Sequence, residues 1–355
     1  MSPRRDGNRA PLAAGAVLVV MAVTIALAPA ASRAVTADRG PGPVQAVGPI
    51  GLTVSDLDRS VAFYRDVLSF TPVAQEEKLG PELERLEGVF GAHVRSARLR
   101  LGAEEVVLTE YLAPRGRPIP LDMRSNDRAF QHLAIVVSDM PRAYQWLREH
   151  HVRHVSTAPQ TLPAWNKGAA GIAAFYFADP DDHTLELIFF PAGKGDPRWQ
   201  PAGRAARPLF LGIDHTAIAV ASTAQSLRFY RDALGFRIAG ESENYGTEQE
   251  HLNNVAGAHL RITGLRAAAG PGVELLEYLN PRDGRPAPAD GRANDLFHWQ
   301  TVLRAANPGA AAQRAVGAGG VATSPAVVEI DDAAFECHRA RLVSDPDGHG
   351  LLVAQ

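Results

Sequence analysis

Histidine and glutamate side chains lie in or beside apolar segments at several points of this chain. Glu274 stands within VELLEYL (273–279), a run that is typical of a β-strand. A carboxylate buried in such a strand needs a polar partner, or the strand must line a solvated cleft. His215 opens the apolar segment HTAIAV, and His298 lies in NDLFHWQTVL. Each histidine is either an ordinary residue at the edge of the core or a metal ligand, and its position alone leaves both interpretations open.

The two-residue period of a β-strand decides which neighbouring polar residues can lie on the same face. Glu277 follows Glu274 by three residues, so a regular strand turns the two carboxylates to opposite faces. His298 and Gln300 are two residues apart and share one face. Only one of the two glutamates can therefore face a given cleft, whereas His298 and Gln300 can face the same one.

Two further histidines and two arginines have simpler explanations. His183 ends ADPDDH and His349 ends SDPDGH, and both sequences are typical of turns that a histidine hydrogen bond closes. Arg117 and Arg285 occur in matching GRP segments. Either arginine could bind a substrate carboxylate, but an exposed, solvated arginine explains the pattern equally well.

The second half of the chain repeats the first. VAFYRDVLSF (61–70) returns as LRFYRDALGF (227–236), with six of the ten residues identical. Further on, LTEYLAPRGRPIP matches LLEYLNPRDGRPAP, and ADPDDHTLEL matches SDPDGHGLLV. Residues 47–190 therefore recur as 212–355, and a linker rich in glycine, proline and arginine, 191–211, joins them.

Each half divides again into two similar units. Each unit starts with an apolar strand, a capping residue and an amphipathic helix, and continues with further strands. The four modules span 47–114, 130–190, 212–281 and 296–355. A module of this size exposes one apolar sheet face, so the modules should pack in pairs. The pattern predicts an α+β fold.

These motifs resemble those of the vicinal oxygen chelate superfamily, which includes glyoxalase I, bleomycin resistance proteins and type I extradiol dioxygenases. FYRDALGF after the first strand and DPDGH before the last carry the resemblance, which extends over nearly all of 47–355. It implies four βαβββ modules paired into two glyoxalase-like domains. We expect these domains at 47–190 and 212–355, after a first linker at 38–46.

The resemblance also implies one divalent metal ion, Fe, Mn, Ni or Zn, held by the first and last strands of paired modules. In the second half the matching positions are His215, Glu274 and His298, with Glu277 and Gln300 as alternatives. The fourth position, where a glutamate is expected, is Leu352.

The first half matches the ligand positions less well. Its four positions are Pro49, Val107, His132 and Glu186, of which only the last two can ligate. A mononuclear site normally needs three protein ligands. His132 and Glu186 are therefore expected to be a vestigial second site in a structural domain.

The function that the resemblance implies is proton transfer next to a carbonyl, in the cleft of the second half. The substrate would be a small molecule with two neighbouring oxygens, and Glu274 could double as the base. An extradiol-type dioxygenase is the alternative, although Leu352 replaces the final-strand glutamate that its metal triad uses. A metal-free small-molecule binding protein of the resistance type is a further alternative.

Composition and the N-terminus complete the expectations. The 36 basic and 39 acidic residues nearly balance, so charge gives no reason to expect a nucleic-acid partner. Arginines precede the apolar run 12–28, and small residues follow it, a pattern typical of an export signal within 1–37. The protein is then periplasmic or secreted; an uncleaved segment would anchor it to the membrane instead. The sequence does not indicate an oligomeric state.

Overall fold

The computed structural model describes residues 42–200 and 207–355. The predicted export signal, 1–37, lies outside these residues. Among the helices that the structure describes, none is both long and apolar enough to cross a membrane.

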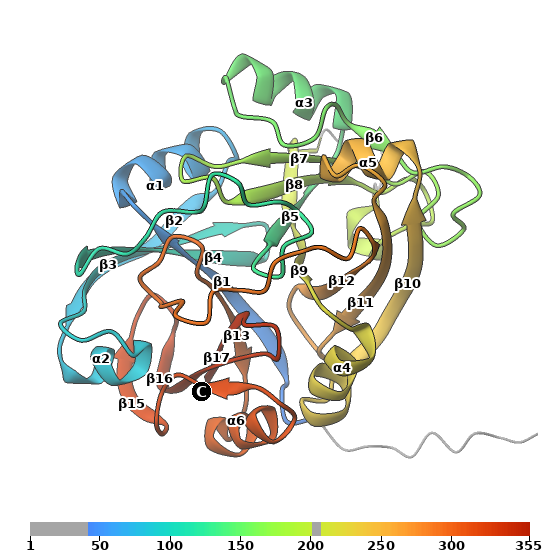
Figure 1. Ribbon diagram of the computed structural model, residues 1–355. Helices are drawn as coiled ribbons and strands as arrows, with labels where there is room; N and C mark the ends of the chain where they lie inside the picture. Colours follow the sequence, from blue (N-terminus) through green and yellow to red (C-terminus); the bar gives the residue numbers. More distant parts are fainter. Residues whose placement is uncertain (1–41, 201–206) are drawn as a thin grey trace, which may run out of the picture. The chain divides into compact units, whose positions relative to one another are not determined.

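Four modules follow one another along the chain (Figure 1). The first comprises β1 (Ala46–Val54), α1 (Leu57–Asp66), β2 (Thr71–Leu79), α2 (Pro81–Glu87), β3 (His93–Leu101) and β4 (Glu104–Ala113). The second comprises β5 (Gln131–Val137), α3 (Met140–Glu149), β6 (Gln160–Thr161), β7 (Ala173–Ala178) and β8 (Thr184–Phe189). A short 3₁₀ turn, η1 (Pro197–Trp199), lies in the linker.

The second half repeats this order. The third module comprises β9 (Phe210–Ala219), α4 (Thr223–Leu227), the π-helical turn η2 (Arg228–Ala233), β10 (Arg237–Tyr245), α5 (Thr247–Asn253), β11 (His259–Arg266) and β12 (Gly272–Asn280). The fourth comprises β13 (Trp299–Arg304), α6 (Pro308–Gly317), β14 (Val321–Ala322), β15 (Val328–Asp332), β16 (Cys337–Ser344) and β17 (Gly350–Ala354).

The strands form two sheets, and each sheet combines one module from each half. The first sheet has the order β14-β16-β17-β13-β1-β4-β3-β2, with β15 paired to β16. The second has the order β10-β11-β12-β9-β5-β8-β7-β6. The joins are antiparallel pairs of first strands, β1 with β13 and β5 with β9. Module one therefore shares a sheet with module four, and module two with module three.

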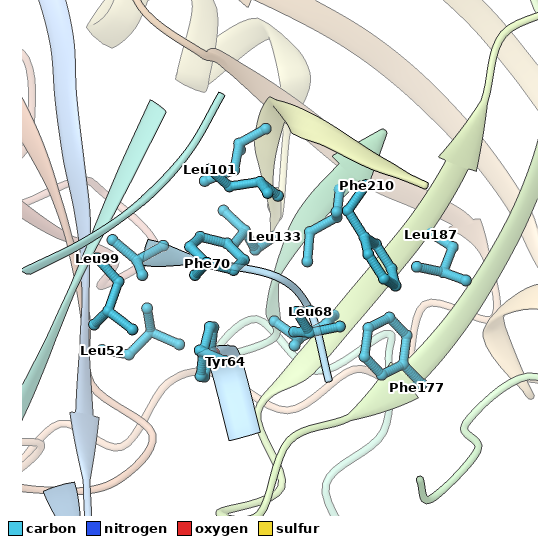
Figure 2. Close-up of a cluster of buried hydrophobic side chains, with 14 of the residues drawn as sticks. Leu52, Tyr64, Leu68, Phe70, Leu99, Leu101, Leu133, Phe177, Leu187 and Phe210 are labelled. Atoms are coloured by element: carbon cyan, nitrogen blue, oxygen red, sulfur yellow. The ribbon is translucent and has the colours of Figure 1, made fainter. Parts of the chain in front are cut away.

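Within each half, the two modules pack against each other through the apolar sheet faces on which their helices lie. In the first half, Leu52 and Leu99 lie in one buried cluster with Leu133, Phe177 and Leu187 of the second module (Figure 2). The second half has the corresponding cluster between its third and fourth modules. The predicted α+β fold of paired βαβββ modules is confirmed, with a core inside each half and two sheets that each continue from one half into the other.

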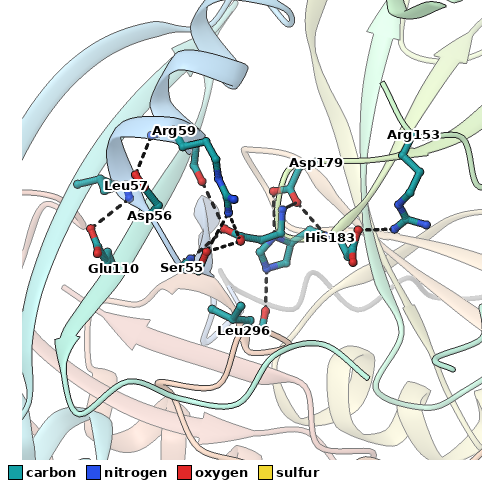
Figure 3. A network of polar contacts seen from close by, with 12 residues as sticks. Ser55, Asp56, Leu57, Arg59, Glu110, Arg153, Asp179, His183 and Leu296 are labelled. Carbon is teal, nitrogen blue, oxygen red and sulfur yellow. Dashed lines mark hydrogen bonds and ion pairs between the residues drawn. The ribbon is translucent and has the colours of Figure 1, made fainter. Parts of the chain in front are cut away.

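The duplicated motifs occupy equivalent environments. Tyr64 and Tyr230 are both fully buried, and their hydroxyls donate to Asp179 and Asp345 at 3.3 and 3.0 Å. His183 Nδ1 lies 2.8 Å from Asp179 Oδ2 within its turn (Figure 3). Its twin in the last turn makes the same contact with Asp345. The internal duplication and the turn-closing histidines are confirmed.

The repeated arginines are bound to acidic residues of the other half. Arg117 Nη2 lies 2.7 Å from Asp295 Oδ2, and Arg285 Nη2 lies 2.6 Å from Asp127 Oδ2. Each acid also accepts from the backbone N–H of its arginine, at 2.8 Å. These residues cross-link the two halves, so both arginines already have carboxylate partners within the protein.

Candidate metal centre

Four potential ligands meet on one face of the second sheet. His132 on β5 and Glu186 on β8 come from module two. His215 on β9 and Glu274 on β12 come from module three. The site thus takes two side chains from each half of the chain.

Two alanines place these side chains on a common face. Ala134 pairs with His215 on one side and with Glu186 on the other. Ala217 pairs with His132 and with Glu274. Because paired residues of neighbouring strands point to the same face, all four polar groups converge above two methyl groups that leave room between them.

The ligating atoms lie close together. His132 Nε2 is 3.1 Å from Glu186 Oε2, and His215 Nε2 is 3.6 Å from the same oxygen. Glu274 Oε2 is 3.6 Å from His215 Nε2. One ligand atom from each of His132, Glu186 and His215 lies within 4.8 Å of the other two. A metal with bonds of about 2.0–2.2 Å holds two ligands at most about 4 Å apart, so only a small contraction is needed.

Three buried nitrogens in this cluster, both ring nitrogens of His132 and Nε2 of His215, have no hydrogen-bond partner. Within the described parts of the chain, neither His132 Nε2 nor His215 Nε2 makes a hydrogen bond, although carboxylate oxygens are near both. The side chains of His132 and His215 are only 1% and 8% exposed. A buried polar atom without a partner costs about 1–3 kcal/mol. A divalent cation would satisfy the two Nε2 atoms, which face the glutamates, so this donor set fits such an ion.

A β-bulge orients His215. The pairing of β5 with β9 shifts between Ala134 and Ile135, which leaves Asp214 as an extra residue in β9. Asp214 Oδ2 lies 3.0 Å from His215 Nδ1. Trp199 and Arg266 each donate to the same carboxylate at 2.7 Å. With Nδ1 engaged as the donor, Nε2 is free to face the cluster.

Burial and charge in and beside the cluster shift the pKa values of His215, Glu274 and Asp214. Burial alone would lower the pKa of His215, but Glu274, Asp214 and Glu186 raise it to about 9. Burial raises the pKa of Glu274 above its usual value, and the nearby His215 offsets this only in part. Burial would likewise raise the pKa of Asp214, yet the hydrogen bond from His215 and the charge of Arg266 hold it below its usual value. A metal and a proton therefore compete for His215.

The prediction that His298 joins His215 and Glu274 is wrong. His298 lies immediately before β13, in the first sheet, with Nε2 3.4 Å from Gln300 Oε1. Gln300, the alternative, is the true counterpart of His132, because it pairs with Gly51 of β1 as His132 pairs with Ala217 of β9. It too belongs to the first sheet.

The first sheet has no ligand set at the corresponding positions. Val107 pairs with Gly51 of β1, as Glu274 pairs with Ala217 of β9 in the second sheet. Leu352 pairs with Val302 of β13, as Glu186 pairs with Ala134 of β5. Val107 and Leu352 are fully buried in one apolar cluster. The prediction that Leu352 faces His215 is therefore wrong.

His132 and Glu186, expected as a vestigial pair, instead lie beside His215 and Glu274. The sequence did hold a signal for this grouping. Each half had lost the ligand positions that the other kept, so the two incomplete sets add up to one complete set. The roles of Ala134, Ala217 and Asp214 had no such signal.

Glu277 lies away from the cluster. Its Oε2 accepts from the backbone N–H of Thr223 and from Arg261, both at 3.1 Å. Its twin Glu110 accepts from the N–H of Leu57 at 3.1 Å, as Figure 3 shows. Both glutamates anchor the start of a helix, which explains why the EYL segments repeat.

An open hollow of about 560 Å³ adjoins the cluster, and both His215 and Glu274 line it. Its floor includes Gly240 and Gly264, which stand beside Glu274 in the row of paired residues. Glu274 is the most exposed of the four ligands, with 25% of its side chain accessible. The cluster is therefore open to the hollow on the side of Glu274.

Comparison with known proteins identifies the family to which this architecture belongs. The family model described as the Glyoxalase/Bleomycin resistance protein/Dioxygenase superfamily matches residues 46–187 and 212–353. The chain belongs to this superfamily. Members of the glyoxalase superfamily generally bind a divalent metal, and the buried cluster of His132, Glu186 and His215 is the matching feature here.

Two relatives in the glyoxalase superfamily and one solved structure are similar to the chain. A 2-epi-5-epi-valiolone epimerase from Actinomyces sp. is 38% identical over 160 residues, which is 43% of this chain and 83% of the relative. Metallothiol transferase FosB from Staphylococcus saprophyticus is 24% identical over 147 residues, 41% of this chain and 76% of the relative. Glyoxalase I from Zea mays has a TM-score of 0.54 at 14% identity, over 88% of this chain and 92% of that one, which shows a shared fold.

Proposed function

We propose that this protein is a divalent-metal-dependent enzyme that transfers a proton next to the carbonyl of a small molecule with two neighbouring oxygens. The position of Glu274 carries the proposal. It belongs to the ligand cluster, it is the one member with substantial exposure to the hollow, and burial raises its pKa. A carboxylate with a raised pKa next to an open cleft is suited to accept and return a proton.

His132, Glu186 and His215 would hold the metal, with Glu274 as a fourth donor on the open side. Fe, Mn, Ni and Zn all suit this mixture of imidazole and carboxylate. The bound ion would act as a Lewis acid toward the substrate oxygens and thereby make the neighbouring C–H more acidic. His132, Glu186 and His215 are buried, so the site is open mainly on the side of Glu274.

In the proposed reaction, Glu274 takes the proton from the carbon next to the carbonyl. The C–H electron pair moves toward the carbonyl oxygen, and the protonated Glu274 later returns the proton. If the planar intermediate turns its other face toward Glu274, return to the same carbon inverts its configuration. Return to the neighbouring carbon, with transfer of the hydroxyl proton to the first oxygen, moves the carbonyl. The similarity to an epimerase at 38% identity supports the first outcome.

An oxygenase remains the second candidate because His132, Glu186 and His215 by themselves form two histidines and one carboxylate. That triad is typical of non-haem Fe(II) oxygenases. The objection based on Leu352 no longer applies, since Glu186 supplies the final-strand glutamate. The additional carboxylate of Glu274 departs from the triad, and it favours proton transfer.

Deuterium exchange tests the proposal. The purified protein, loaded separately with Fe(II), Mn(II), Ni(II) or Zn(II), is incubated in D₂O with a panel of hydroxyketones and polyhydroxy cyclohexanones. NMR then follows the loss of signal from the proton next to the carbonyl. We expect exchange with at least one compound, and a loss of at least about 100-fold in Glu274→Gln.

Glu277→Gln is the matched control, because its carboxylate lies at a helix start outside the cluster. Exchange that persists in Glu274→Gln would contradict the assigned base. Oxygen uptake with catechols by the Fe(II)-loaded protein, without deuterium exchange, would favour the oxygenase.

A further inference from the structure

Three arginines line the hollow beside the cluster, and two of them are bound within the protein. Arg266 donates to Asp214 at 2.7 Å, both to its side chain and to its backbone carbonyl. Arg198 forms an ion pair with Glu104 and lies over the ring of Trp199, 4.0 Å from its centroid. These two arginines have their charges matched by neighbouring acids.

Arg237 is different. It is exposed and lines the same hollow, and its side chain has no hydrogen bond or ion pair with any residue in the ranges that the structure describes. It pairs with Arg266 across β10 and β11, so both side chains leave the same face of the sheet. The guanidinium of Arg266 lies over Gly272, where an added Cβ would meet Cζ at 3.0 Å. Gly272 in turn pairs with His215. The row therefore runs from His215 in the cluster through Gly272 and Arg266 to Arg237 on β10.

Beside this row, the surface of the sheet next to Glu274 is open. A Cβ at Gly240 would meet no atom within 4 Å, and one at Gly264 would meet only the Gly240 carbonyl, at 3.8 Å. Both glycines lie in the hollow. A bound molecule can therefore extend from Glu274 across these glycines toward Arg237 without displacing a side chain.

The first sheet supplies an internal comparison. There Arg98 holds the position of Gly264, because it pairs with Val107 as Gly264 pairs with Glu274. Thr71 holds the position of Arg237, because it pairs with Arg100 as Arg237 pairs with Arg266. The open floor and the additional arginine thus occur together, on the sheet that has the ligand cluster.

We propose that Arg237 binds an anionic group of the substrate, so that the substrate class is an acidic or phosphorylated hydroxycarbonyl compound. Three strand spacings of about 4.8 Å separate the backbones of His215 and Arg237, roughly 14 Å in all. This separation leaves room for the two side chains and for one small ring or a short chain between the chelated oxygens and the anion. This inference rests on the proposed function, because the other end of the molecule sits at the metal.

Matched hydroxamates test the subsite. Acetohydroxamate has the two neighbouring oxygens alone, succinomonohydroxamate adds a carboxylate, and phosphoglycolohydroxamate adds a phosphate. Calorimetric titration of the metal-loaded protein measures the affinity for each. We expect at least one anionic probe to bind about tenfold more tightly than acetohydroxamate, since a charge-assisted hydrogen bond of this kind is strong.

Variants separate the subsite from a general effect of charge. In Arg237→Ala the advantage of the anionic probe should disappear while acetohydroxamate binds as before, and Arg237→Lys should keep part of it. Arg228→Ala, which removes an exposed arginine outside the hollow, should keep all of it. An unchanged melting temperature shows that each variant is folded.

The outcomes are distinguishable. If acetohydroxamate binds but neither anionic probe gains affinity, or if the gain survives in Arg237→Ala, the subsite is wrong and the proposed function stands. If acetohydroxamate does not bind the metal-loaded protein, the proposed function fails, and the subsite fails with it. A gain for only one anionic probe identifies the anion as carboxylate or phosphate.

Discussion

His132 and His215 face each other across the β5–β9 pair, with ring centroids 5.8 Å apart and ring planes inclined by 62°. They belong to different halves of the duplicated chain, and each brings a glutamate from its own module. The cluster therefore exists only when the two halves share a sheet. Any change that separates β5 from β9 should remove metal binding together with activity.

Metal content is the first test of this arrangement. Purified protein should bind one divalent ion per chain, measured by elemental analysis after dialysis. His132→Ala and His215→Ala should each lower that content strongly, because each removes a donor from the same site. The double variant should be no worse than the more affected single variant.

His298→Ala is the matched control for the histidine variants. Burial lowers the pKa of His298 to about 4, so this residue is a neutral histidine in the first sheet and outside the cluster. Its metal content should equal that of the wild type. A second bound ion, or loss of metal in His298→Ala, would contradict a single site in the second sheet.

Asp214→Asn should weaken metal binding without removing a ligand. The carboxylate holds His215 Nδ1 at 3.0 Å, and the amide would no longer secure the orientation and tautomer that present Nε2. Loss of such an outer hydrogen bond typically costs about 10–100-fold in metal affinity. Competition with a chromophoric chelator measures the change. Asp331→Asn, which removes an exposed acid outside the hollow, should leave the affinity unaltered.

Gly264→Arg should reproduce the closed floor of the first sheet. Arg98 occupies that position there, so the backbone accepts an arginine, and in the second sheet its side chain would fill the hollow. We expect metal to be retained while deuterium exchange falls by at least about tenfold. Gly264→Ala, whose Cβ meets only an ordinary contact at 3.8 Å, is the control. Full activity in Gly264→Arg would show that substrate does not use this hollow.

The turn at Asp179 should make stability depend on pH. Burial opposes the charge on His183, but Asp179 and the Leu296 carbonyl raise its pKa above the usual value of about 6.5. The folded state therefore binds the proton more tightly than the unfolded state. This stabilisation is complete below about pH 6.5 and is lost as pH rises through the folded pKa.

Asp179→Asn tests this linkage in thermal melts between pH 5 and pH 9. The variant loses the carboxylate that favours the charged imidazole, so the difference from the wild type should be largest near pH 5 and should shrink toward pH 9. A difference in melting temperature that does not depend on pH should also remain, because Asp179 accepts hydrogen bonds from the Tyr64 hydroxyl and from a backbone N–H. A difference that grows with pH would mean that His183 is neutral in the folded protein.

We also propose that residues 1–37 direct export of this protein. Mass spectrometry of protein isolated from its native host should find an N-terminus after the apolar run 12–28. An intact Met1 in the membrane fraction would support the anchor instead, and an intact Met1 in the cytosol would exclude both.

Much of the fold follows from local properties of the sequence. The spacing of apolar residues and the caps at Asp56 and Ser222 determine where strands end and helices begin. The repeat predicts the duplication, and strand period separates Glu274, on the cluster face, from Glu277. The residue types of the site, histidine and glutamate in apolar strands, were likewise evident before the structure.

The tertiary structure decided which of these residues meet. Every module has a first strand with an open edge, and strands of similar pattern could pair in more than one combination. Which first strands pair depends on how the two modules of each half pack. Leu52, Leu133 and Leu187 join modules one and two through their apolar faces, and this packing leaves the edge of β5 free to pair with β9. His132 thereby reaches His215, and His298 does not. A bulge of one residue, at Asp214, then sets the register that brings His215 over Ala134, and spacing along the chain cannot encode such a long-range pairing.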